Sequence, residues 1–108
     1  MATTYKVLGQ SAPSATTATT LYTVPGGTQV VGSSVVICNQ GAAGSYRIAV
    51  RVAGATLTQA QYLCYDTPIS ANGTVAYTIG FTLGAGDVIT VYASHANFSF
   101  NAFGGEVA

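Results

Sequence analysis

Apolar and polar residues alternate with a period of two along most of this chain, and no stretch shows the period of an amphipathic helix. The clearest alternation spans residues 46–52, where one set of positions is expected to face a core and the other to face solvent or a partner. The core set is Tyr46, Ile48, Val50 and Val52, and the outer set is Arg47, Ala49 and Arg51. The same alternation predicts strands at residues 75–83, 87–93 and 98–103.

The first half of the chain has less regular apolar runs, which predict strands at residues 5–9, 21–24, 30–38 and 61–65. Residues 30–38 are apolar on both faces apart from serines, which is typical of a central strand covered on both sides. Residues 39–44 (NQGAAG) predict a hairpin loop into the strand that follows. Residues 66–68 (DTP) predict the end of the strand before them.

Short strands at intervals of about 8 to 12 residues, separated by glycine-rich turns, are typical of a sandwich or barrel. We therefore expect one all-β domain over residues 1–108, a β-sandwich of about eight antiparallel strands with a jelly-roll-like or immunoglobulin-like topology. Residues 11–20 have low sequence complexity and are a candidate extended arm.

Charge is unusually scarce. Only 6% of the residues are charged, and three basic residues balance three acidic ones, whereas about a quarter is usual. Neither nucleic-acid binding nor a polybasic membrane patch has an electrostatic basis here. Because net charge near zero promotes association, the composition favours a protein packed against its own copies or a larger body. The alternative is a monomer kept soluble by hydroxyl and amide side chains.

The first residues lack the apolar run of a secretory signal, and no stretch approaches the roughly 18 apolar residues of a membrane span. We therefore expect synthesis in a cytoplasm without export. In a reducing compartment Cys38 and Cys64 are expected to be free, partly buried thiols. A disulfide between them is the alternative, and it requires neighbouring strands.

Candidate chemistry is sparse. His95 is the only histidine, so a catalytic triad would have to combine it with a cysteine or serine and with Asp66 or Asp87. No nucleophile signature supports such a triad, and His95 fits a polar loop residue better. Neither zinc nor calcium ligands have the required spacing. The sequence predicts no catalytic residue, no metal site and no cofactor.

Two sets of residues are candidates for recognition. Arg47 and Arg51 lie on one strand face about 13 Å apart and are candidate interface residues, with solvated positions or ion pairs with Asp66 or Asp87 as the alternatives. The second set would line a sugar site, although core and interface packing is the alternative use of tyrosine in a chain without tryptophan. Its members are Tyr62, Tyr65 and Tyr92.

Seven segments in this order resemble small virion structural proteins of tailed bacteriophages, those of cyanophages in particular. They are residues 4–10, 21–25, 34–39, 46–51, 65–68, 86–92 and 98–106. The stretch at 21–25 (LYTVP) and the valine-rich strand after it are also similar to β-sandwich modules of phage tail and baseplate proteins. Residues 25–27 (PGG) depart from the similar sequences, which often have alanine there.

The resemblance implies a non-enzymatic protein located in a virion. We expect a capsid decoration or cement protein whose partners are the major capsid protein first, tail proteins second, and its own copies. The alternative is a tail, baseplate or fibre module that acts as an assembly adaptor or binds a host glycan.

Overall fold

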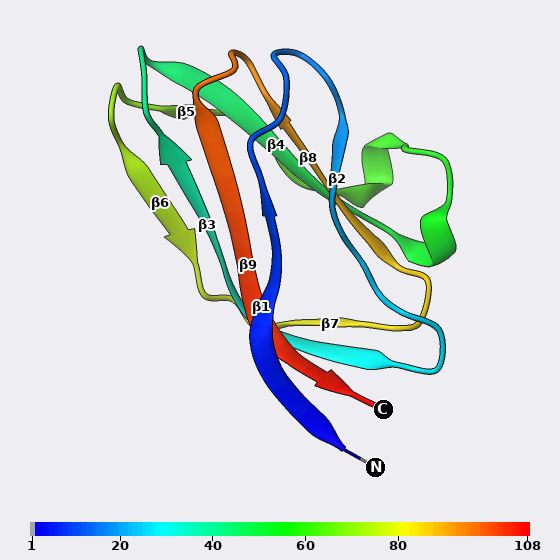
Figure 1. Ribbon diagram of the computed structural model, residues 1–108. Helices are drawn as coiled ribbons and strands as arrows, with labels where there is room; N and C mark the ends of the chain where they lie inside the picture. The colour runs from blue at the N-terminus through cyan, green and yellow to red at the C-terminus, as the bar shows by residue number, and fades with distance from the viewer. Residues whose placement is uncertain (1) are drawn as a thin grey trace.

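Nine β-strands form two antiparallel sheets that pack face to face in the computed structural model, which describes residues 2–108 (Figure 1). Sheet A has the order β1-β9-β3-β6, with β7 also paired to β3, and sheet B has the order β2-β8-β4-β5. This confirms the predicted β-sandwich. The strands are β1 (Thr3–Ser11), β2 (Thr19–Thr23), β3 (Gln29–Asn39), β4 (Gly44–Arg51), β5 (Tyr62–Ile69), β6 (Thr74–Tyr77), β7 (Phe81–Leu83), β8 (Val88–Ala93) and β9 (Phe98–Val107).

The strand pairing is nested. The first strand pairs with the last, β2 pairs with β8, β3 pairs with both β6 and β7, and β4 pairs with β5. Successive pairs alternate between the two sheets, as in one long hairpin that has been rolled up. This nested order is that of a jelly roll. Of the two topologies that the sequence left open, the structure therefore has the jelly-roll-like one and not the immunoglobulin-like one.

The predicted strand at residues 75–83 is in fact two strands, β6 and β7. Gly80 between them has a φ of 64°, a left-handed conformation that interrupts a strand and that glycine adopts without steric cost. Ile79 is consequently 66% exposed rather than buried. Because both strands pair with β3, they fill one position of the sheet, and the jelly roll has eight strand positions.

Alternating burial confirms the predicted faces of β9, where Phe98, Phe100 and Ala102 are buried. The two-sided cover predicted for residues 30–38 is wrong. Strand β3 is central in sheet A because β9 and β6 flank it, but its outer face is open and Val31 is 58% exposed.

The connection from β3 to β4 corrects another expectation. Residues 39–44 do not close a hairpin, because β3 and β4 belong to different sheets. Asn39 stabilises this crossing, since its buried amide donates to the carbonyls of Ala42 and Ser70 and its side-chain oxygen accepts from the Gly41 N–H. A buried polar side chain with all these partners joins two loops at one end of the sandwich.

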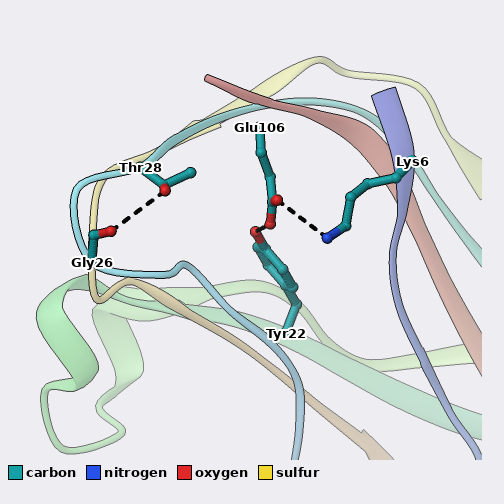
Figure 2. Close-up of polar contacts among 5 residues, drawn as sticks. All are labelled: Lys6, Tyr22, Gly26, Thr28 and Glu106. Carbon is teal, nitrogen blue, oxygen red and sulfur yellow. Dashed lines mark hydrogen bonds and ion pairs between the residues drawn. The ribbon is translucent and has the colours of Figure 1, made fainter. Parts of the chain in front are cut away.

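The opposite end is joined by a polar bridge between the sheets (Figure 2). Glu106 of β9 accepts a hydrogen bond from the Tyr22 hydroxyl of β2 and pairs with the Lys6 ammonium of β1 at 3.2 Å. These hydrogen bonds, from Tyr22 first and then from Lys6, lower the pKa of Glu106. Burial, followed by the bond to Glu106, raises the pKa of Tyr22.

The low-complexity residues 11–20 supply the last residue of β1, the first two residues of β2 and the link between them. The link runs from sheet A to sheet B. It contacts the sandwich through the Thr16 N–H, which donates to the Ala93 carbonyl at 2.8 Å, and through the buried Pro13.

Candidate binding surfaces on the two sheets

The outer face of sheet B is partly covered by residues 52–61, which contain the short 3₁₀ turns η1 (Val52–Gly54) and η2 (Gln59–Gln61). Turn η1 lies against β8 and η2 lies against β4. Arg51 fixes this segment by donating to the carbonyls of Gly54 and Ala55 at 2.9 and 2.8 Å. Asp87 fixes it further by accepting the Ala53 N–H at 2.8 Å.

This cover corrects the prediction of a one-sided β4. Ala49, expected on a solvated face, is fully buried, although it does not belong to the core between the sheets. Val52, expected in that core, is 66% exposed because the strand ends at Arg51. The alternation of residues 46–52 places the side chains on the correct sides, but the segment that follows them buries the outer side.

A cluster of stacked side chains occupies the same outer face beside this cover. The Arg47 guanidinium lies between the Tyr65 and Tyr92 rings, 4.2 and 4.0 Å from the two ring centroids. It also forms a forked pair with the Asp66 carboxylate, with nitrogen–oxygen distances of 2.6 and 3.2 Å. The Tyr62 ring meets the Tyr65 ring nearly at right angles, with centroids 4.9 Å apart. We call these five residues the arginine–tyrosine cluster.

A β-bulge builds this cluster. In the pairing of β4 with β5, Tyr46 lies opposite Thr67 and Ile48 opposite Cys64, so Tyr65 and Asp66 together face Arg47. Asp66 has a φ of 48°, a left-handed conformation that is uncommon for any residue except glycine. Residues 66–68 therefore do not end the strand as predicted, because β5 continues through the bulge to Ile69.

The electrostatics of the cluster are internally balanced. The hydrogen bond with Asp66 raises the pKa of Arg47, and the same contact lowers the pKa of Asp66. Both groups stay ionised around neutral pH, and their charges compensate each other. The sequence alternative of an ion pair between Arg47 and Asp66 is present, and Arg51 is engaged by backbone carbonyls instead.

A hollow adjoins the cluster between β5 and the cover. It has a volume of about 650 Å³ and is lined by Leu57, Thr58, Gln59, Tyr62 and Tyr65. The three candidate tyrosines therefore lie together with Arg47, whereas Arg51 lies apart from them and binds the segment 52–61. Neither the bulge nor the hollow has a signal in the alternation pattern, which assumes a regular strand.

The outer face of sheet A has a different character. The strands of sheet A contain two charged residues, Lys6 and Glu106, and both are engaged in the bridge to Tyr22. Three apolar or aromatic side chains are exposed on the outer side: Tyr5 at 84%, Val31 at 58% and Val7 at 45%. Among residues 2–108 this face carries no charged side chain of its own. We call it the uncharged face.

The remaining chemical groups are used structurally. The His95 Nε2–H lies 2.8 Å from the Ala42 carbonyl, and Nδ1 accepts the Asn97 N–H at 3.2 Å, so both ring nitrogens contact backbone groups. Cys38 and Cys64 are free and half-buried, on β3 and β5 of different sheets. Within residues 2–108, no three potential metal-ligating side chains gather into a group.

No helix in the described part of the chain has the length and apolar character needed to cross a bilayer.

Comparisons with known proteins found similarity among solved structures. No protein-family model matches the chain, and no curated protein is similar to it. The fold is similar to the crystal structure of a pentameric capsid protein isolated from metagenomic phage sequences, with 19% sequence identity and a TM-score of 0.39. The similarity covers 96% of this chain and 59% of that one, so this chain spans about three fifths of that protein. At this level the similarity does not decide what the chain does.

Proposed function

We propose that this domain is a non-enzymatic structural protein of a tailed-phage virion that binds the capsid shell as a decoration or cement protein. The observation that supports this proposal best is the distribution of charge. All six charged side chains make polar contacts within the domain, and the uncharged face presents Tyr5, Val7 and Val31 to the outside.

An uncharged face with exposed apolar side chains is suited to packing against protein. Interface cores are depleted in charge, as this face is, and are enriched in aromatic residues, of which this face exposes Tyr5. A decoration protein must attach by many weak contacts rather than by a reaction, and an open sheet face offers area for such contacts. The resemblance of seven segments to phage virion proteins supports the same function independently.

The major capsid protein is the proposed first partner, with tail proteins second and further copies of this chain as lateral neighbours. Arg47 and Arg51 remain candidate interface residues at the outer side of β4. Because Arg47 is paired with Asp66 and Arg51 donates to backbone carbonyls, we expect both to contribute through shape more than through free charge.

The test uses purified protein and mature capsids that lack it, at low and at moderate salt. We expect stoichiometric binding that survives the added salt, because no free charge pairs drive it. The variant Tyr5→Ser with Val31→Ser should weaken capsid binding while the circular dichroism spectrum and melting temperature stay close to wild type. Binding that disappears at moderate salt, or that ignores this double variant, contradicts the use of the uncharged face.

The second candidate function is a tail, baseplate or fibre module, which the similarity of residues 21–25 and the following strand to such modules favours. The same experiment with isolated tails distinguishes the two positions. Stoichiometric binding to tails without binding to capsids would replace the decoration function by an assembly adaptor.

A further inference from the structure

We propose that the hollow beside Tyr62 and Tyr65 is a binding site for an uncharged carbohydrate. This site lies on the outer face of sheet B, away from the uncharged face of sheet A, and the inference does not depend on where the domain sits in a virion.

The dimensions of the hollow suit a small ligand. Its volume of about 650 Å³ falls within the roughly 300–1,000 Å³ of typical small-molecule sites. Its wall at residues 58–61 is held by a capping box, in which the Gln61 side chain accepts the Thr58 N–H at 2.7 Å and the Thr58 side chain caps the turn in return. The hollow is therefore bordered by an ordered turn.

The two tyrosine rings form a rigid corner. Their planes are 87° apart, and Tyr65 is 58% exposed. Arg47 stacks on Tyr65 from the cluster side, and its pair with Asp66 fixes the guanidinium. Because the rings already contact each other and Arg47, a ligand that stacks on them has less side-chain freedom to remove.

The backbone at Asp66 explains how the corner is built. A left-handed φ of 48° costs some free energy even in aspartate, which adopts it more readily than most non-glycine residues. Here the strained residue belongs to the bulge that brings both Tyr65 and Asp66 to Arg47. A regular strand would direct one of the two away from the cluster.

The lining selects the chemical class of the ligand. An aromatic ring carries negative charge on its face, which attracts the weakly positive C–H groups on the apolar side of a sugar ring. The Thr58 hydroxyl and the Gln59 amide at the border supply hydrogen-bonding groups for sugar hydroxyls. A pyranose offers these two kinds of surface side by side.

Charged ligands and extended peptides fit less well. No charged side chain lines the hollow, and the nearby Arg47 and Asp66 neutralise each other, so phosphates and acidic sugars gain nothing. A polyproline segment docks along successive aromatic grooves. The single corner made by Tyr62 and Tyr65 instead suits one ring-shaped guest.

The test is a nuclear magnetic resonance titration of the ¹⁵N-labelled domain with cellotetraose, maltotetraose and decaproline in separate experiments. We expect one of the two glucans to shift the amide signals of residues 57–65, with a Kd near 1 mM, as is usual for a few stacked rings. Tyr65→Ala should weaken sugar binding about tenfold. Arg47→Ala should weaken sugar binding less, because this variant keeps the Tyr65 ring and removes only the guanidinium that stacks on it.

The matched control is Tyr5→Ala, which removes an equally accessible tyrosine from the uncharged face and should leave sugar binding unchanged. In the capsid-binding experiment, Tyr65→Ala should bind as well as wild type. This result would show that the sugar site and the proposed capsid contact are separate. The inference would be overturned if neither glucan shifted the signals of residues 57–65 at about 50 times the expected Kd. It would also be overturned if decaproline shifted those signals and neither glucan did. Sugar binding that persists at full strength in a folded Tyr65→Ala would do so as well.

Discussion

The outer faces of the two sheets show how one core can carry two different surfaces. Sheets A and B bury the same kind of side chain between them, including Ile37 and Phe100 from sheet A and Ile48 and Val91 from sheet B. Outside, sheet B carries the clamped segment 52–61 and the arginine–tyrosine cluster, whereas sheet A is bare and uncharged. Four of the six charged residues lie on the sheet B side. Arg47 and Asp66 belong to the cluster, and Arg51 and Asp87 bind the segment 52–61.

The comparison teaches that the few charges of this chain serve construction rather than solubility. Arg51 and Asp87 hold the cover, and Arg47 and Asp66 hold the tyrosines. Lys6 and Glu106 join the sheets at Tyr22. The outer face of sheet A has no comparable polar construction, and its exposed side chains are Tyr5, Val7 and Val31.

The largest effect is expected from placing one carboxylate on each outer face. Ala49→Asp in the central strand β4 should lower the free energy of unfolding by several kcal/mol, because it buries a charge without a partner under the cover. The matched change Val31→Asp in the central strand β3 should cost less than about 1 kcal/mol, since Val31 is 58% exposed. Urea unfolding measures both, and equal losses would mean that the two faces do not differ in cover.

An intermediate effect is expected from opening the arginine–tyrosine cluster. Arg47→Ala removes two contacts with aromatic rings and should lower the free energy of unfolding by about 1 kcal/mol. Arg47→Lys should restore little of this loss, because an ammonium group lacks the flat, forked head that stacks and pairs at once. Thermal unfolding compares the variants, and full rescue by lysine would show that charge alone, rather than stacking, holds the cluster.

The smallest effect is expected from the bridge between the sheets. The folded-state pKa of Glu106 lies below its ordinary 4.5, so its contribution to stability is present above that pH and is lost as the pH falls through the lower folded value. Glu106→Gln should therefore be less stable than wild type near pH 7, and the difference should shrink as the pH falls below 4.5 and through the lower folded-state pKa. Urea unfolding at several pH values checks this, and a constant difference at all pH values would contradict the ionic role of Glu106.

Some of these features are readable from the sequence, and others are not. The alternation at residues 98–103 predicts the buried face of β9 correctly, because each residue there points to the opposite side of its neighbour. The same argument at residues 46–52 separates the two sides correctly but assigns solvent to Ala49. Burial on the outer side depends on residues 52–61, which have no periodic pattern of their own.

The candidate site follows the same division. Tyr62, Tyr65 and Tyr92 are recognisable as candidates because a sugar-binding module presents exposed aromatic side chains near the ends of its strands. The contact between Arg47 and Tyr65 depends on the bulge at Asp66, and the residue types in this segment do not predict that bulge. The roles of Asn39 and Tyr22 have no signal in the sequence, because a buried hydrogen bond is recognisable only once its distant partner is known.

The sequence by itself determined that this chain is a β-sandwich with very little charge, because period-two alternation and composition are local properties. Only the tertiary structure decided which strands are neighbours, that the two faces differ, and that an arginine and three tyrosines gather at one place. The physical reason is that strand pairing joins residues far apart in the chain, such as Thr3 with Val107, and a local pattern carries no information about such partners.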